Sequence, residues 1–413
     1  MPRKRKMSKA QGGIITALIT ILLVILGVFY SLTGINPGGV FPATETPVSN
    51  APLDAATNTP FQPGDGSATL DPGQATLLPQ SEEWWRVYFT DPLTINDPAD
   101  YSNSIEQRLI EFINVSQTSI HIAAFEFDLD PVADALIAAH NRGVDVRWVT
   151  DNEHGLEADT EPGGGQFAKL QNAGIEVRAD IRTALMHNKF WIFDGLVLWT
   201  GSTNITENGV FVQDNNTIVF QSPELATIYE REFQEMWDGQ FGPKSPSQLA
   251  EQSVVINGTP IQVIFTSEDP VLESNIIPIV NSATSSIRFL AFSFTDYPLA
   301  NAMIQRMQQG VDVAGVMDKT QAGGQGAELG TLFCAGVPVR HDGNKQFMHN
   351  KIIIVDERYV ITGSLNFSTS AEESNDENVI IIDNPDIARL YMQDFERVYN
   401  QGTEPDPAKV TCP

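Results

Sequence analysis

The feature that most constrains the fold of this chain is a long internal repeat. RGVDVRWVTD at 142–151 returns as QGVDVAGVMD at 309–318, an offset of 167 residues. GIEVRAD at 174–180 returns as GVPVRHD at 336–342, an offset of 162 residues. A repeat of this length predicts two copies of one folding unit, packed about a pseudo-twofold axis.

Within each copy, short β-branched or aromatic runs alternate with segments of helical spacing. In the first copy this pattern predicts strands at 86–90, 119–127, 144–150 and 175–178, and helices at 105–115, 131–140 and 167–172. Alternation of this kind is typical of an α/β fold.

A paired motif lies at matching places in the two copies. His187-Asn-Lys189 is followed by Asp194 and by Gly-Ser-Thr-Asn at 201–204. The same order recurs 162 residues later as His349, Lys351, Asp356 and Gly-Ser-Leu-Asn at 363–366. Because residues i and i+2 of a strand face the same way, each His and its Lys would point together into a cleft.

The two H-x-K-x4-D motifs with their trailing G-S-x-N resemble the phospholipase D superfamily, and the resemblance covers about residues 84–400. It implies two α-β-α sandwich units of the phospholipase D type. The second half, from Ala291 to Val379, is similar to the small bacterial nuclease branch and to lipid-acting members with short repeats.

The chemistry that the resemblance implies is cleavage of a phosphodiester through a covalent phosphohistidine. One imidazole attacks phosphorus and the second protonates the leaving oxygen. Lys189 and Lys351 would stabilise the charge of the transition state. No metal and no cofactor is required. Further hydrogen bonds to the phosphate are expected from Ser202, Asn204, Ser364 and Asn366, whereas Asp194 and Asp356 are interpreted as structural turn or ion-pair residues.

One difference between the copies suggests how the histidines divide the work. The second copy has Glu377 where the first has Asn215. If Glu377 orients His349 and Asn215 orients His187, the carboxylate favours an imidazolium at His349 and leaves His187 neutral. On that hypothesis His187 is the nucleophile and His349 the general acid.

The rest of the chain divides by composition. We expect a basic cytoplasmic N-terminus (1–12), a transmembrane anchor (13–33), a flexible linker (34–82), the first repeat (83–245), the second repeat (252–402) and a C-terminal tail (403–413). The stretch from Ile14 to Leu32 carries no charge and is long enough to span a bilayer, with a basic cluster before it. A cleaved signal peptide and a buried core helix are the alternatives. As an anchor, this segment predicts a single-pass protein of the cell membrane with an extracytoplasmic catalytic part.

The charge of the chain bears on its substrate. The formal net charge is −27, and the part beyond the basic N-terminus carries −32 (20 basic against 52 acidic residues). Such a surface repels polyanions, which favours a phospholipid substrate at the membrane. An exported nuclease is the second hypothesis, a phosphatidyl-transferring synthase the third, and a non-catalytic binding module the alternative from another class. No obligate protein partner is inferred. Cys334 and Cys412 could pair or remain free thiols.

Overall fold

The computed structural model describes residues 84–92, 104–249 and 252–412. The expected N-terminus (1–12), anchor (13–33) and linker (34–82) lie outside this part. Among the described residues, no helix is both long and apolar enough to cross a membrane.

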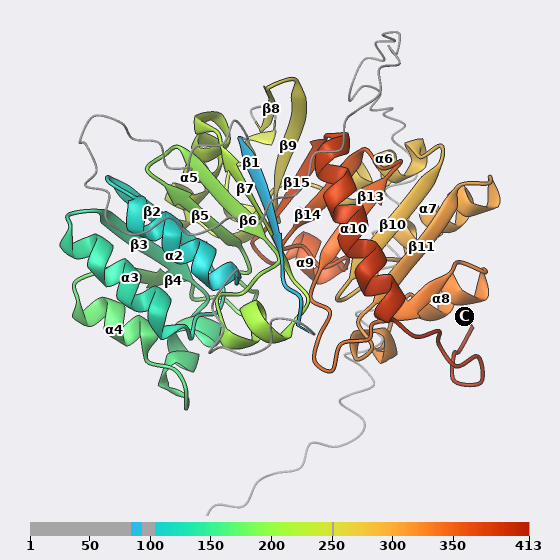
Figure 1. Ribbon diagram of the computed structural model, residues 1–413, viewed down its shortest axis with the longest axis horizontal. Coiled ribbons are helices and arrows are strands. Elements are labelled where there is room, and N and C mark those ends of the chain that lie inside the picture. The colour runs from blue at the N-terminus through green and yellow to red at the C-terminus, as the bar shows by residue number, and fades with distance from the viewer. Residues whose placement is uncertain (1–83, 93–103, 250–251, 413) are drawn as a thin grey trace, which may run out of the picture. The chain divides into compact units, whose positions relative to one another are not determined.

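The first half builds a seven-stranded mixed sheet (Figure 1). Its strands are β1 (Trp85–Phe89), β2 (Ser119–Ala124), β3 (Asp145–Thr150), β4 (Glu176–Ala179), β5 (Lys189–Phe193), β6 (Val197–Gly201) and β7 (Asn216–Gln221). They lie in the order β1-β7-β6-β5-β2-β3-β4. The pairs β2–β3 and β3–β4 are parallel and the other pairs are antiparallel.

The second half repeats that order with one strand added. Its strands are β8 (Ser253–Ile256), β9 (Thr259–Thr266), β10 (Ser286–Ala291), β11 (Asp312–Met317), β12 (Val339–His341), β13 (Lys351–Val355), β14 (Tyr359–Gly363) and β15 (Glu377–Asp383). The order β12-β11-β10-β13-β14-β15-β9-β8 matches the first sheet strand for strand, with β8 as the extra edge. The α/β class and the doubled unit predicted from the sequence are confirmed.

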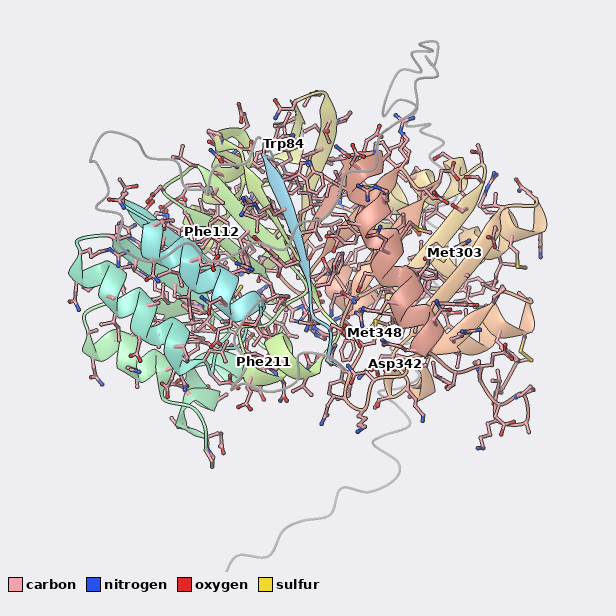
Figure 2. The ribbon with its side chains drawn as sticks, in the orientation of Figure 1. Trp84, Phe112, Phe211, Met303, Asp342 and Met348 are labelled. Carbon is pink, nitrogen blue, oxygen red and sulfur yellow. A yellow bond between two sulfur atoms is a disulfide. The ribbon has the colours of Figure 1, made fainter. Side chains whose placement is uncertain are left out.

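Helices cover both sheets. In the first half they are α2 (Ile105–Val115), α3 (Asp130–Asn141), α4 (Gln166–Asn172) and α5 (Pro223–Trp237); in the second half they are α6 (Ile277–Ser282), α7 (Tyr297–Gln308), α8 (Leu329–Cys334), α9 (Thr369–Glu373) and α10 (Pro385–Gln401). Phe112 of α2 and Met303 of α7 belong to two outer cores, which Figure 2 shows on opposite sides. A third core contains Met348 and joins apolar residues of both sheets to α5 and α10. This shared core brings the two motif strands close together.

Two expectations are resolved by the fold. The strand predicted to run to residue 127 ends at Ala124, because its partner β5 begins at Lys189, directly opposite. Phe125 to Phe127 therefore leave the sheet beside the motif. Cys334 and Cys412 form a disulfide that ties α8 to the C-terminal tail, which settles the question of pairing that the sequence left open.

Candidate active site

The two motifs lie at the starts of equivalent central strands, with Lys189 opening β5 and Lys351 opening β13. All four His and Lys side chains are buried. Each ammonium group donates to the carbonyl of its own histidine, Lys189 Nζ at 2.9 Å and Lys351 Nζ at 2.7 Å. The structure therefore gathers the predicted His and Lys pairs from both halves into one site.

The partners of the histidine rings cross between the halves. Nδ1 of His187 lies 2.7 Å from Oε2 of Glu377, and Nδ1 of His349 lies 3.0 Å from Oδ1 of Asn215. The sequence interpretation paired Glu377 with His349 and Asn215 with His187, and this pairing is wrong. It assumed that each histidine is held from within its own repeat.

Backbone pairing between the halves explains the crossing. The N–H of His187 donates to the carbonyl of Asp376 at 2.9 Å, and the N–H of His349 donates to the carbonyl of Asp214 at 2.8 Å. Each motif is thus joined to the segment that precedes β15 or β7 of the opposite half. The next residue of that segment, Glu377 or Asn215, is thereby brought to the opposite histidine.

A layer of buried amides repeats the crossing beneath the rings. Asn378 Nδ2 donates to Asn188 Oδ1 at 2.9 Å, and Asn216 Nδ2 donates to Asn350 Oδ1 at 2.8 Å. Asn188 and Asn350 are the middle residues of the two H-N-K motifs. Because buried polar groups are costly to leave unpaired, this layer fixes how the halves fit together.

The motif serines hold the histidine partners, which corrects the role predicted for them. Ser202 Oγ donates to Asn215 Oδ1 at 2.8 Å, so its one hydroxyl proton is not directed at a phosphate. Ser364 hydrogen-bonds the Glu377 carboxyl and accepts from the N–H of Asn378 at 3.0 Å. Both serines therefore act through the groups that orient the rings.

The motif asparagines differ from each other. Asn204 Nδ2 donates to Glu126 Oε2 at 2.7 Å, and the Oδ1 atoms of Asn204 and Asn366 are both buried without a hydrogen-bond partner. In the second half, the residue that corresponds to Glu126 is Ser293. Of the four side chains expected to bind phosphate, only these two amides retain a free N–H for that purpose.

The motif aspartates lie at turns on the far ends of the strands. Asp194 accepts from the backbone N–H groups of Gln117, Thr118 and Ser119. Asp356 accepts in the same way from Thr284, Ser285 and Ser286. Both have positive φ, near 55°. Their carboxylates thus tie the β5–β6 and β13–β14 turns to the strands β2 and β10.

The glycine of each G-S-x-N is required by a close approach of two strands. A Cβ on Gly201 would lie 2.3 Å from the carbonyl oxygen of Asn216, and one on Gly363 would lie 2.2 Å from that of Asn378. Both glycines also have a φ that side chains disfavour, 151° and 140°. They let the amide layer sit directly behind the motif strands.

Sequence reasoning missed four residues that shape the site, all at repeat-matched positions. Asp151 and Asp318 accept from the N–H of Met186 (3.1 Å) and Met348 (3.2 Å), each the residue before a motif histidine. The rings of Phe125 and Phe292 make T-shaped contacts with the rings of His187 and His349, at centroid distances of 4.8 and 4.7 Å. Their recurrence as TD/MD and AFEF/AFSF in the two copies was the signal that could have identified them.

Burial and mutual charge set the protonation of the site. Burial, then the ammonium groups of Lys189 and Lys351, lowers the pKa of both histidines well below its usual value. Burial also lowers the pKa of Lys189 to about 8 and raises the pKa of Glu377 to about 7. Burial, then the charge of Lys189, also lowers the pKa of Lys351 well below its usual value. Two lysine side chains beside one such carboxyl suit an anion such as phosphate better than a metal cation.

Comparison with known proteins agrees with this geometry. The family model described as "Cardiolipin synthase, PLD-like domain" matches residues 109–237 and 276–399, together more than half of the chain. The chain therefore belongs to the phospholipase D superfamily, and its two halves are two domains of this type.

Individual relatives match parts of the chain. A mouse protein named mitochondrial cardiolipin hydrolase is 37% identical over 138 residues, which is 33% of this chain and 61% of the relative. A Rickettsia conorii protein named phospholipase D is 34% identical over 116 residues, 28% of this chain and 58% of the relative. The chain thus spans about three fifths of the length of these relatives. The structure of phosphatidylserine synthase from Haemophilus influenzae covers 76% of this chain and 85% of its own, with a TM-score of 0.54 and 14% identity, which shows the fold.

Proposed function

We propose that this protein is a phosphodiesterase of the phospholipase D type that hydrolyses glycerophospholipids through a phosphohistidine. The observation that carries the proposal is the convergence of His187, Lys189, His349 and Lys351 with both rings held through Nδ1. Each Nε2 is then the ring nitrogen that remains for the substrate. One ring can attack phosphorus while the other acts on the leaving oxygen.

In the reaction we propose, Nε2 of His187 attacks the phosphorus and the bond to the alcohol oxygen of the head group breaks. His349, protonated on both ring nitrogens when the anionic phosphodiester is bound, gives its Nε2 proton to that oxygen, and the head group leaves as an alcohol. His349 then takes a proton from water, whose oxygen attacks the phosphorus and displaces His187. Phosphatidate leaves and both histidines return to their starting states.

The crossed contacts support the same division of roles as the sequence hypothesis, for a different reason. Formation of the N–P bond puts a positive charge on the attacking ring. The carboxyl of Glu377, 2.7 Å from Nδ1 of His187, can stabilise that charge, whereas the amide of Asn215 at His349 cannot do so to the same extent. His187 is therefore the better nucleophile.

A lipid substrate is supported by three features. Relatives are named cardiolipin hydrolase and phospholipase D. The segment 13–33 is expected to anchor the protein as a single-pass protein of the cell membrane, with the catalytic part outside the cytoplasm, which would hold the site beside lipid. The strongly acidic composition would repel DNA and RNA.

The test incubates the full chain in EDTA with vesicles of phosphatidylcholine and cardiolipin and, separately, with single-stranded DNA. We expect phosphatidate or its cardiolipin equivalent, and loss of the product in His187→Ala but not in the control His140→Ala. Phosphatidyl transfer to an added alcohol, in preference to water, would identify a synthase. Cleavage of DNA without lipid turnover, or activity only with an added metal ion, would contradict the proposal.

A further inference from the structure

The helices α5 and α10 are equivalent in the two halves but carry opposite charges at one position. They align residue for residue at an offset of 162, which pairs Glu232 with Asp394 and Glu235 with Arg397. Both acidic residues of the first pair are buried, 5% exposed in each case. In the second pair, α5 carries the anion Glu235 where α10 carries the cation Arg397, and in both helices this residue follows the buried carboxylate by three positions.

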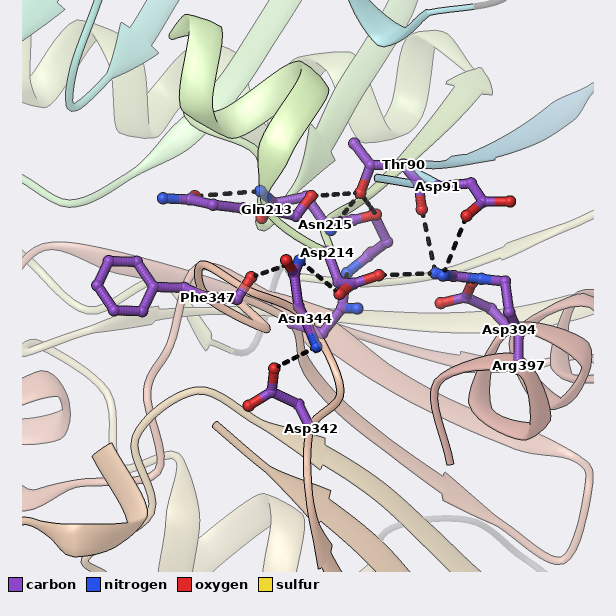
Figure 3. A network of polar contacts seen from close by, with 12 residues as sticks. Thr90, Asp91, Gln213, Asp214, Asn215, Asp342, Asn344, Phe347, Asp394 and Arg397 are labelled. Carbon is purple, nitrogen blue, oxygen red and sulfur yellow. Dashed lines mark hydrogen bonds and ion pairs between the residues drawn. The ribbon is translucent and has the colours of Figure 1, made fainter. Parts of the chain in front are cut away.

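At the C-terminal helix α10, one guanidinium contacts three carboxylates (Figure 3). Arg397 lies 2.7 Å from Asp394, 3.0 Å from Asp214 and 3.6 Å from Asp91. It also donates to the carbonyl of Thr90 at 3.0 Å. This cluster joins α10 to the end of β1 and to the segment that pairs with His349.

In the first half, the equivalent place is lined by carboxylates. Oxygen atoms of Glu232, Glu235 and Glu268 all lie within 4.8 Å of one another. They surround a cavity of about 10 Å³, the size of one water molecule or one ion. Arg231, Gln248 and Gln252 also line this cavity. The counterpart of Asp214 is Asp376, and it is paired with Arg182, which approaches from a loop and not from the helix.

Part of this carboxylate cluster has no partner. No residue in the described ranges donates a hydrogen bond to the Glu232 carboxylate, and Oε2 of Glu268 is buried without a partner. Glu235 accepts from Ser245 Oγ at 2.6 Å and from Gln248. Burial and the neighbouring carboxylates raise the pKa of Glu232, and that of Glu268 to about 8. Buried anions of this kind must be neutralised by protons or by a cation.

We propose that a hard divalent cation, with Ca²⁺ as its best fit, binds between the carboxylates of Glu232, Glu235 and Glu268, in the place that Arg397 fills in the other half. Carboxylate oxygens are the ligands that Ca²⁺ prefers, and three of them supply more negative charge than one ion needs. The ion would tie α5 to the segment after β9, as Arg397 ties α10 to the end of β1. The site contains none of the catalytic His and Lys residues, so its role is structural and independent of the proposed reaction.

The first measurement uses the full chain after dialysis against EDTA and removal of the chelator. Calorimetric titration with CaCl₂ at constant ionic strength is expected to show one ion per chain. The midpoint of thermal unfolding, Tm, should rise by about 5 °C or more when the ion is in large excess over its dissociation constant. A titration with no saturable heat and no change in Tm would overturn the proposal.

Variants then locate the ion. Glu235→Gln should weaken Ca²⁺ binding at least about tenfold, because it removes one anionic ligand and keeps the side-chain shape. The matched control is Glu396→Gln, which removes an exposed carboxylate from α10 and should bind as the wild type does.

The decisive variant introduces into α5 the residue type that α10 has at the equivalent position. Glu235→Arg places a guanidinium where Arg397 lies in α10, so the Ca²⁺ response should disappear while Tm in EDTA rises above that of the wild type. If this variant does not fold, Glu268→Gln decides, with the same loss of affinity expected as for Glu235→Gln. Wild-type affinity in both glutamine variants would overturn the assignment.

Discussion

His187 and His349 occupy equivalent strands of the two halves, yet different chemical groups hold their rings. His187 faces the carboxyl of Glu377, which also accepts a hydrogen bond from Nδ2 of Asn375 at 3.0 Å. His349 faces the amide of Asn215 and the carbonyl of Ser202, both neutral acceptors. Both motif strands are buried, and a phenylalanine ring packs against each histidine at a similar distance, so the two rings differ mainly in their polar partners.

The duplicated scaffold has kept its geometry, whereas the two half-sites have become unequal. A symmetric pair of histidines would have no preference between attack and proton transfer. One carboxyl in place of an amide gives the rings different abilities to carry positive charge, and in the reaction we propose this difference separates the nucleophile from the acid. The same divergence recurs in Arg397 and Glu235, at equivalent places on α10 and α5.

The largest expected effect is loss of either histidine. His187→Ala and His349→Ala should each reduce kcat on the order of 10³-fold or more, because neither half contains both reacting groups. Thermal unfolding should show that both variants remain folded. The measurement is release of head group from vesicles, with His140→Ala as the control that keeps wild-type turnover.

The covalent intermediate separates the two rings directly. Rapid alkaline quenching followed by peptide mass spectrometry should place the phosphatidyl adduct on His187. An adduct on His349, with His187 unmodified, would reverse the roles. It would also contradict the proposal that the Glu377 carboxyl stabilises the positive charge of the attacking ring.

A smaller effect is expected at the groups that hold the rings. Glu377→Gln should lower kcat on the order of 10²-fold with little change in KM, because it removes the charge that stabilises the cationic phosphohistidine. Asn215→Ala should cost about tenfold, since Ser202 still offers its carbonyl to His349. Equal losses in the two variants would show that both contacts serve only to orient the rings.

The sequence was sufficient to predict the duplicated α/β unit and the four motif side chains. These features depend on hydrophobic alternation and on residues repeated at a constant offset, and both can be recognised in one dimension. The helix 105–115 has the predicted bounds because Ser104 caps its first turn and its apolar face is regular.

The crossed contacts could not be predicted in the same way. Whether Glu377 reaches His187 or His349 depends on how two sheets pack, and the backbone bonds from His187 to Asp376 and from His349 to Asp214 fix this only in three dimensions. The role of Ser202 was missed for a related reason. A hydroxyl near a catalytic histidine can face the substrate or the protein, and only the position of Asn215 decides between them.

The pH dependence should reveal the buried lysine of the first half. Burial lowers the pKa of Lys189 to about 8, so kcat/KM should fall as the pH rises above about 8 and the ammonium group loses its proton. Lys189→Arg keeps its charge and should shift this alkaline decline upward by at least one pH unit, even if its rate is lower. The pH profile of His140→Ala should match the wild type. A decline at the same pH in Lys189→Arg would assign it to another group.

The smallest expected effect concerns the turns that the motif aspartates hold, where the halves are most alike. Burial alone would raise the pKa of Asp356, but hydrogen bonds from Ser286, Ser285 and Thr284 hold it well below its usual value. A lowered folded-state pKa stabilises the protein above the unfolded pKa, near 4, and this contribution is lost as the pH falls further. Asp356→Asn should therefore reduce the free energy of unfolding by about 1 kcal/mol at pH 7, a modest value because solvent screens the partly exposed carboxylate. Denaturant unfolding should show this difference shrinking below pH 4, with a comparable loss at pH 7 for Asp194→Asn. A difference independent of pH would mean that the turn depends on the shape of Asp356 and not on its charge.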